Sequence, residues 1–192
     1  MRRFDGVIFD MDGTLVEPLL DFQQIRAELG IAASDGIIEA IEAMPPRRAE
    51  SCRRRLLAHE LAAARRAKLL NGAAETVNRI RRAGMKTALL TRNAAEAMQI
   101  ILRRFDLAFD LAWSRELGPI KPEPDGILRA CRQLDIQASR TACVGDFRYD
   151  LVAANGAGAV SVLLARRGRP DFADLADYVI TELAQLCGIL GI

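Results

Sequence analysis

The feature of this sequence that most restricts its fold is a series of short apolar runs separated by helix-forming segments. The runs are rich in aliphatic residues, as in strands that are buried on both faces of a sheet. They cover residues 7–9, 87–90, 111–113, 141–145, 160–164 and 178–180, with helical patterns at 73–83, 94–105, 124–134 and after about 149. Strands that alternate with helices predict an α/β fold with a doubly wound parallel sheet.

A different pattern fills the segment after the first strand. From residue 16 to residue 74 the chain is rich in Ala and Arg, and we expect helices there in place of strands. The expected helices cover residues 21–29, a segment capped by Ser34 or Asp35, and residues 47–70, with Gly30 and Pro45-Pro46 as breaks. We therefore predict a small helical cap of residues 16–74, inserted into a core formed by residues 1–15 and 75–192.

The first predicted strand ends in two aspartates. Asp10 and Asp12 are separated by one residue, and Gly13 follows them, which permits a sharp turn and the close approach of a ligand. Carboxylates at the end of a buried strand lose solvation, so this pattern favours a cation site that also binds a phosphate. A calcium loop is the alternative, but it would have a third acidic position before its glycine and a helix in front.

Other polar residues occupy equivalent places along the chain. Thr91, Lys121 and Asp146 lie at or just after the ends of later predicted strands. In doubly wound sheets, ligands bind beyond the carboxyl ends of the strands, where the winding changes direction. We therefore expect Asp10, Thr91, Lys121 and Asp146 to converge on one edge of the sheet.

These residues belong to four motifs that resemble, in content and order, those of the haloacid dehalogenase-like hydrolase superfamily. The motifs are Asp10-Met11-Asp12-Gly13-Thr14, Thr91 after an apolar run, Lys121 before Pro122, and Gly145-Asp146 with Asp150. The resemblance covers nearly the whole chain and is to the phosphoglycolate phosphatase-like branch with a small cap. It implies a Rossmann-like core and Mg²⁺-dependent hydrolysis of a small phosphorylated metabolite, either a phosphoglycolate-like acid or a sugar phosphate.

The resemblance also implies a role for each matching residue. Asp10 would attack phosphorus and form an aspartyl-phosphate. Asp12 would act first as general acid and then as general base, which calls for a raised pKa. Thr91, Arg92 and Gly13 would hold the phosphoryl group, partly through backbone amides. A threonine that only caps the following helix is the alternative for Thr91.

Lysine is rare in this chain, which makes Lys121 conspicuous. Only Lys68, Lys86 and Lys121 are lysines among the 27 basic residues. Lysine offers a compact point charge on a slim stem, which suits a position between a nucleophile and a phosphoryl group. We therefore expect Lys121 to bind both groups, with a solvated lysine before a proline as the alternative.

The resemblance implies that Mg²⁺ is the cofactor. The carboxylates of Asp10 and Asp146 and the backbone carbonyl of Asp12 would be its protein ligands, in keeping with the preference of Mg²⁺ for oxygen. Asp150, four residues after Asp146, would support the site by hydrogen-bonding a metal-bound water or Lys121. An acidic residue that only favours a helix N-terminus is the alternative for Asp150.

Composition limits the other classes of function. The net charge is +2 and aromatic residues are few, so we expect no nucleic-acid partner. No apolar run approaches the roughly 18–20 residues that span a membrane, so we expect a cytoplasmic protein without a membrane partner. Four scattered cysteines favour core thiols over a zinc site, and one histidine, His59, is too few for multi-histidine catalysis. No pattern indicates the oligomeric state.

Phosphatase is the reaction that this comparison of motifs favours. The dehalogenase branch lacks the second aspartate and the metal, and phosphonoacetaldehyde hydrolases carry a cap lysine that is absent before Lys68. A phosphomutase remains an alternative, although such enzymes usually hold a histidine early in the cap and residues 16–30 contain none. A non-catalytic Mg²⁺- or phosphate-binding regulator is the second alternative, but it would need neither Asp10 nor Asp12.

Substrate specificity in this superfamily comes from the cap. Arg47 and Arg48 follow the stiff Pro45-Pro46 turn, which is a suitable mount for a side chain that pairs with a carboxylate or a second phosphate. A solvated pair at the start of a long helix is the interpretation that the pattern favours. Positive charge is unfavourable at a helix N-terminus, however, and this points to a role in substrate binding as the alternative.

Overall fold

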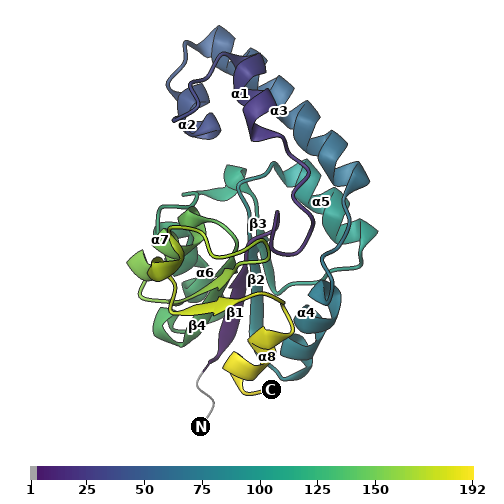
Figure 1. Ribbon diagram of the computed structural model, residues 1–192, viewed down its shortest axis with the longest axis vertical. Coiled ribbons are helices and arrows are strands. Elements are labelled where there is room, and N and C mark those ends of the chain that lie inside the picture. Colours follow the sequence, from purple (N-terminus) through teal and green to yellow (C-terminus); the bar gives the residue numbers. More distant parts are fainter. Residues whose placement is uncertain (1–3) are drawn as a thin grey trace.

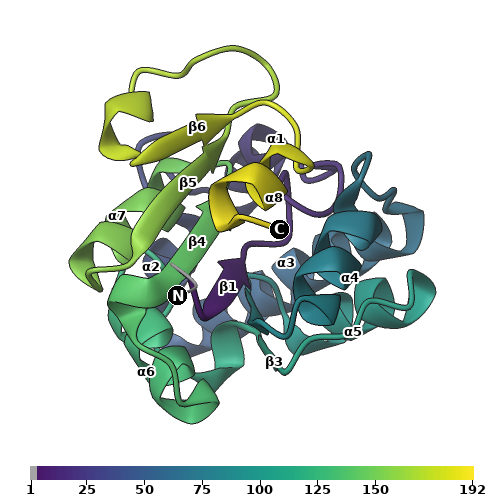
Figure 2. The same cartoon turned by 90° about the horizontal axis from the view of Figure 1, so that it is seen from below.

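The computed structural model describes residues 4–192 and contains a six-stranded parallel sheet (Figures 1 and 2). The strand order is β3-β2-β1-β4-β5-β6. The strands are β1 (Gly6–Phe9), β2 (Lys86–Leu90), β3 (Leu111–Trp113), β4 (Thr141–Gly145), β5 (Val160–Leu164) and β6 (Tyr178–Ile180). The winding changes direction between β1 and β4, so the predicted doubly wound α/β fold is confirmed.

Helices cover both faces of the sheet (Figure 2). On one face lie α4 (Ala73–Arg82), α5 (Ala95–Arg104) and α8 (Gln185–Leu190), and on the other lie α6 (Asp125–Leu134) and α7 (Arg148–Gly156). Alternate residues of β1 serve the two layers. Val7 and Phe9 are buried against the first group of helices, whereas Ile8 is buried against the second. Short 3-10 helices, η1 (Arg115–Leu117), η2 (Ala138–Arg140) and η3 (Ala173–Leu175), complete the core.

Three helices inserted after β1 form a cap above the carboxyl edge of the sheet (Figure 1). They are α1 (Phe22–Leu29), α2 (Ile37–Glu42) and α3 (Pro46–Arg66). Asp21 caps α1 by accepting a hydrogen bond from the Gln24 amide. The cap has an apolar cluster of its own, which includes Ile25, Ile41 and Leu56.

Two details of the cap differ from expectation. The N-cap of α2 is Gly36, without a side-chain hydrogen bond, rather than Ser34 or Asp35. In addition, α3 ends at Arg66 rather than near residue 70. After Arg66 the chain returns to the core in an extended conformation. Its backbone there forms hydrogen bonds with the segment that leads from β1 to the cap.

The two segments that join cap and core run side by side. The Leu70 amide donates to Leu15 O, and the Glu17 amide donates to Lys68 O. Farther along, α3 packs lengthwise on α5 of the core (Figure 1). The paired segments support the proposed cap boundary near residue 16, and the long α3–α5 contact fixes the cap over one end of the sheet.

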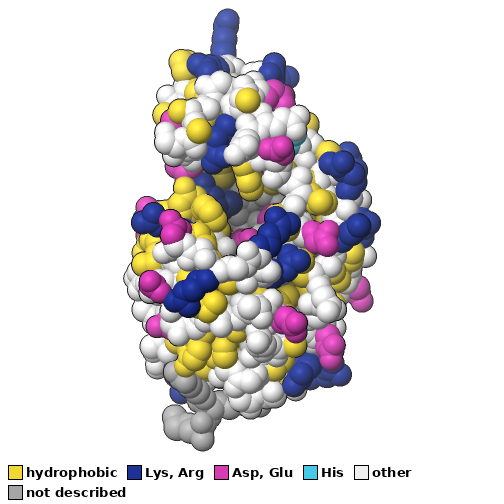
Figure 3. Space-filling view, viewed as in Figure 1, with side chains coloured by type: hydrophobic (Ala, Val, Ile, Leu, Met, Phe, Trp, Pro, Cys, Tyr) yellow, Lys and Arg dark blue, Asp and Glu magenta, His cyan; other side chains and the backbone are white. Residues whose placement is uncertain are grey.

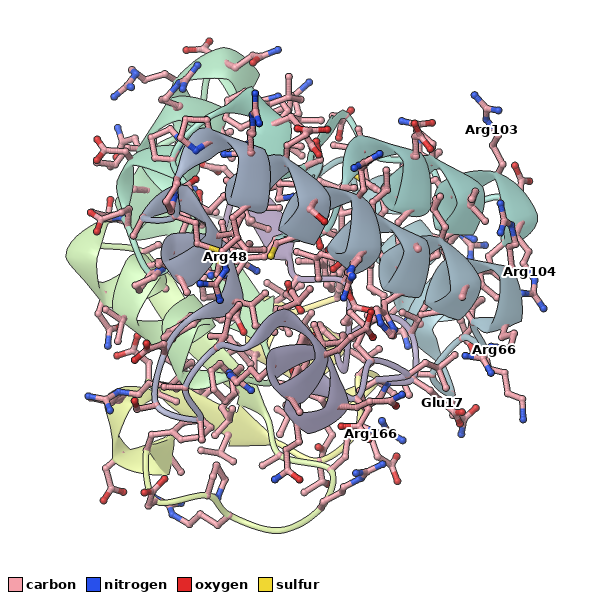
Figure 4. The ribbon with its side chains drawn as sticks, turned by 90° about the horizontal axis from the view of Figure 1, so that it is seen from above. Glu17, Arg48, Arg66, Arg103, Arg104 and Arg166 are labelled. Atoms are coloured by element: carbon pink, nitrogen blue, oxygen red, sulfur yellow. The ribbon has the colours of Figure 1, made fainter. Side chains whose placement is uncertain are left out.

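The remaining composition-based expectations concern individual side chains. All four cysteines are buried, as expected of core thiols. The arginine clusters of α3 and α4 are exposed, and Figure 4 shows Arg66, Arg103 and Arg104 projecting where α3 and α5 end. Within residues 4–192, none of the helices has the length and apolar character needed to cross a membrane.

Candidate active site

The two central aspartates follow the two strands between which the winding changes direction. Asp10 follows β1, and Asp146 follows β4; the Asp10 amide donates a 2.9 Å hydrogen bond to Val144 O. Gly13 has a φ of 80°, and a Cβ there would lie 1.9 Å from Asp146 Oδ2. Glycine is therefore required at this position both for the turn and for the close approach of the Asp146 carboxylate.

Lys121 links two carboxylates in the interior of the site. Its Nζ donates to Asp10 Oδ1 at 2.5 Å and to Asp150 Oδ1 at 2.7 Å, and the residue is 8% exposed. Burial alone would lower the pKa of Lys121, but the charges of Asp10 and Asp150 outweigh this effect and raise it. The solvated alternative for Lys121 is therefore wrong, because the ammonium is buried and charged between two acids.

Asp150 is more than an acidic residue at a helix start. Its Oδ1 accepts from Lys121, while Oδ2 accepts a 3.1 Å hydrogen bond from the Phe147 amide and so caps α7. A Cβ at Gly145 would lie 2.1 Å from the carboxyl carbon of Asp150, so any larger residue at this position would displace the Asp150 carboxylate. Both interpretations of Asp150 therefore apply, since one side chain caps the helix and holds the lysine.

Carboxylate oxygens of Asp10, Asp146 and Asp150 lie within 4.8 Å of one another. Burial raises the pKa of Asp10 to about 6, opposed by the Lys121 charge. Burial also raises the pKa of Asp146 to about 8, and the nearby Asp10 and Asp150 charges add to this effect. Asp150 is buried, and Asp10 and Asp146 are partly buried. A cluster of three carboxylates with a single lysine fits a divalent cation such as Mg²⁺, which would relieve the repulsion between the carboxylates.

Asp12 lies beside this cluster, and its surroundings favour its protonated form. Burial and the negative charges of Asp10 and Glu60 raise the pKa of Asp12 to about 7. The side-chain amide of Asn93 donates a 2.7 Å hydrogen bond to Asp12 Oδ2, which leaves the other carboxyl oxygen for a reacting group. A carboxyl group whose pKa lies near neutrality can serve as acid and as base in one reaction cycle.

The segment that follows β2 contributes Thr91, Arg92 and Asn93. Thr91 is buried, and its Oγ1 accepts a 3.1 Å hydrogen bond from the Asn93 amide, so the threonine does bind the turn that precedes α5. Thr91 also lines the cavity together with Lys121, so a role in phosphate binding remains open to it.

Arg92 connects the core with the cap. Its Nη2 donates to Glu39 Oε1 at 2.7 Å, and its guanidinium stacks 4.9 Å from the centre of the Tyr149 ring. A further donor of Arg92 binds Lys121 O. These contacts occupy the side chain, so its expected part in phosphate binding would require Arg92 to leave Glu39 or to act through its backbone.

An ion pair between buried Glu60 and half-buried Arg115 joins the cap helix α3 to the segment that carries Thr91. Glu60 is 3% exposed and accepts from Arg115, while its other oxygen accepts from the Ala94 amide. Arg115 also donates to Arg92 O. Burial raises the pKa of Glu60, opposed by the hydrogen bond and charge of Arg115. The pair ties the cap to the turn that presents Asn93 to Asp12.

The strand-end residues and the cap enclose a cavity of about 400 Å³. Figure 3 shows the molecule hollowed between cap and core, with hydrophobic side chains along the hollow. Asp10, Asp12, Lys121 and Asp146 line its core side, so the predicted residues do converge at this edge.

Arg47 and Arg48 do not line this cavity. Both are exposed, and Arg48 donates to Leu29 O and Gly30 O at the end of α1, on the cap (Figure 4). A positive charge is favourable at the C-terminal carbonyls of a helix, so Arg48 has a structural role at the end of α1. This favourable contact offsets the unfavourable position of its charge near the N-terminus of α3. The arginine of the cap that lines the cavity is Arg26.

Three residues of the site were not predicted from sequence. Asn93 carried a weak signal, since it is an amide two residues after Thr91 in a motif already identified. Glu60 carried none, because it occurs in a helix with many other charged residues, and Arg26 carried none, because no motif includes it. Their burial or orientation depends on how the cap lies on the core.

Comparisons with known proteins agree with the motifs. A family model described as haloacid dehalogenase-like hydrolase matches residues 4–158. A haloacid dehalogenase-like hydrolase domain-containing protein of Arabidopsis thaliana is 32% identical and covers 98% of this chain and 84% of its own length. A phosphoglycolate phosphatase of Pseudomonas fluorescens is 28% identical over 94% of this chain and 77% of that protein. A solved hydrolase from Pseudomonas syringae has a TM-score of 0.83 and 18% identity, and the match covers 97% of this chain and 98% of that one.

Proposed function

Because this chain belongs to the haloacid dehalogenase-like hydrolase family, we propose that it is a Mg²⁺-dependent phosphatase that hydrolyses a small phosphorylated metabolite through an aspartyl-phosphate. One observation carries the proposal. Asp10 and Asp12 are both partly buried but have different partners: Lys121 donates to the Asp10 carboxylate, whereas the side-chain amide of Asn93 donates to Asp12. The pKa is raised to about 6 for Asp10 and to about 7 for Asp12. Such a difference separates a nucleophile from a proton carrier.

In the first step, a carboxylate oxygen of Asp10 attacks phosphorus, and the bond between phosphorus and the substrate oxygen breaks. Asp12, protonated at this stage, gives its proton to the departing oxygen, so the alcohol leaves neutral. The product is a phosphoryl group bound to Asp10. Splitting the displacement in this way replaces one difficult step by two easier ones.

In the second step, water attacks the aspartyl-phosphate. Asp12, now ionised, accepts a proton from that water, and the bond between phosphorus and the Asp10 oxygen breaks. Inorganic phosphate leaves, and both aspartates return to their starting states. The hydrogen bond from Asn93 keeps Asp12 in one orientation for both proton transfers.

The negative charge of the phosphoryl group would be balanced by positive groups at the cluster of Asp10, Asp146 and Asp150. Asp10, Asp146 and the backbone carbonyl of Asp12 would hold Mg²⁺, supported by Asp150, and the ion would neutralise phosphate charge near the nucleophile. Lys121 adds a positive charge beside Asp10, and Thr91 offers a hydroxyl to a phosphoryl oxygen.

The two alternatives have less support. A phosphomutase would need a group that keeps water from the aspartyl-phosphate. The single histidine, His59, instead binds Glu28 in the cap at 2.7 Å. A non-catalytic regulator would have no use for a proton carrier beside a nucleophile.

Release of inorganic phosphate from para-nitrophenyl phosphate tests the proposal. We expect turnover with Mg²⁺, loss of turnover with EDTA, and recovery when Mg²⁺ is restored. Asp10→Asn should lower turnover by about 10³-fold or more while the far-ultraviolet circular dichroism stays unchanged. Activity of Asp10→Asn within tenfold of the wild type would contradict the proposal, as would no turnover across a broad phosphate panel.

A further inference from the structure

The cap side of the cavity is formed mainly by apolar side chains. Phe22, Ile37, Ile38 and Leu56 line it, together with Pro18 from the connecting segment. Among the described residues that line the cavity from the cap, Arg26 alone has a polar side chain. This wall faces the aspartates and Lys121 on the core side, so one end of the cavity suits an anion and the other suits an apolar group.

Arg26 is already engaged by the backbone of its own cap. Its Nε donates to Asp35 O at 3.0 Å, and its Nη1 donates to Phe22 O at 3.3 Å. These hydrogen bonds tie α1 to the start of the α2 segment. The side chain therefore has fewer donors left for a ligand than a free guanidinium would have.

Three aromatic side chains line this cavity, and the two phenylalanines among them are about half exposed. The chain has ten aromatic residues, seven Phe, two Tyr and one Trp, and three of them, Phe22, Phe147 and Tyr149, line the cavity. Phe22 is 47% exposed and Phe147 is 53% exposed. Phe147 is held edge-on against Tyr149, with ring centres 5.1 Å apart. Exposed aromatic faces on the two sides of one cavity are characteristic of a ligand-binding site.

From these observations we infer that the substrate is a phosphate monoester whose leaving alcohol carries an apolar, flat group such as an aromatic ring. This inference rests on the proposed function, because it places the phosphoryl group at Asp10 and the alcohol toward the cap. The cavity volume of about 400 Å³ is within the range of sites for such compounds. An alcohol rich in hydroxyls would lose its hydrogen bonds to water here and find few replacements.

A matched pair of substrates separates the apolar group from leaving-group reactivity. The pair is 3-phenylpropyl phosphate and 3-hydroxypropyl phosphate, both esters of primary alcohols, with phosphoglycolate as a third compound. We expect kcat/KM for the phenyl compound to exceed those of the other two by at least about tenfold, the effect of burying one ring. A higher kcat/KM for phosphoglycolate or for the hydroxyl compound would overturn the inference.

Variants then assign the preference to the aromatic wall. Phe22→Ala should reduce kcat/KM for the phenyl compound by about tenfold and change that for the hydroxyl compound less than twofold. Phe22→Leu should keep much of the preference. Leu19→Ala is the control, since Leu19 is also apolar and exposed, at 38%, but does not line the cavity. An equal effect of Phe22→Ala on both substrates would contradict the assignment.

The two proposals fail in different ways. If all three alkyl phosphates and para-nitrophenyl phosphate release no phosphate with Mg²⁺, the proposed phosphatase function fails, and this inference fails with it. If phosphate is released but the hydroxyl compound or phosphoglycolate is preferred, the phosphatase function stands and the inference about the leaving group is wrong.

Discussion

The side-chain amide of Asn93 lies 2.7 Å from Asp12 Oδ2 and donates a hydrogen bond to it. Asn93 is buried, and its backbone amide donates to Thr91 Oγ1, while the amide of the next residue, Ala94, donates to Glu60 of the cap. An amide can donate to a carboxylate but cannot exchange a proton with it at neutral pH. Asn93 therefore orients the proposed acid and base without competing for its proton.

Removing this amide should affect substrates according to their leaving groups. A phenolate such as para-nitrophenolate departs without a proton, whereas an alkoxide needs one from Asp12. We expect Asn93→Ala to lower kcat by about tenfold or more for an alkyl phosphate and clearly less for the first step with para-nitrophenyl phosphate. Asn78→Ala, at an exposed position on α4, is the control. A uniform decrease for both substrates in single-turnover measurements would mean that Asn93 does not act through Asp12.

The acidic cluster predicts how stability depends on pH and Mg²⁺. The pKa values of Asp10, Asp12 and Asp146 are raised from 3.8 to about 6, 7 and 8 in the folded protein. The folded state then binds more protons than the unfolded state at intermediate pH, so the free energy of unfolding falls as pH rises from about 4 to 8. Without Mg²⁺, we expect a loss of at least about 2 kcal/mol between pH 5 and pH 8 in urea unfolding.

Mg²⁺ should reverse this loss, because it binds the ionised carboxylates and favours their charged forms. The rise in Tm on adding Mg²⁺ should therefore be larger at pH 8 than at pH 5. Asp146→Asn should stabilise the metal-free protein at pH 8 and reduce its response to Mg²⁺. If the metal-free stability increases steadily from pH 5 to pH 8, the cluster does not have these raised pKa values.

The Glu60–Arg115 pair predicts a link between cap docking and activity. Removing Glu60 leaves the Ala94 amide without its acceptor and Arg115 without its buried partner, although Arg115 keeps Glu116 and Arg92 O. A buried donor left unpaired typically costs about 1–3 kcal/mol. Glu60→Ala should therefore destabilise the protein by about 1–3 kcal/mol and lower kcat in the fraction that remains folded, because the turn before α5 loses its contact with the cap. Glu50→Ala, at an exposed position on the same helix, should have little effect on either measurement. A Glu60→Ala protein as stable as Glu50→Ala would contradict this account.

Much of the core could be predicted because each element carries its own signal. Short aliphatic runs such as residues 141–145 match the observed strands, and glycines such as Gly30 end the expected helix. Parallel strands bring their carboxyl ends to one edge, so residues such as Asp10 and Lys121, which are 111 positions apart, could be placed together before any contact was known.

The cap could be predicted only as a set of helices. Periodicity shows that α3 is amphipathic, but it does not show which neighbour each side of that helix meets. Glu60 is buried because α3 docks on α5, and this long-range contact has no local signature. For the same reason, the sequence could not show that Arg26 rather than Arg48 lines the cavity, because this depends on how the cap lies on the core.

The aspartyl-phosphate is the central element of the proposed function, and Asp12→Asn should make it visible. Without the general base, the intermediate should form from para-nitrophenyl phosphate with Mg²⁺ and then persist. Intact-protein mass spectrometry after an acid quench should show the addition of one phosphoryl group, mapped to Asp10, with one equivalent of para-nitrophenol released. The double variant Asp10→Asn with Asp12→Asn should show neither. Release of para-nitrophenol without a phosphorylated protein, or a phosphoryl group on another residue, would contradict the mechanism.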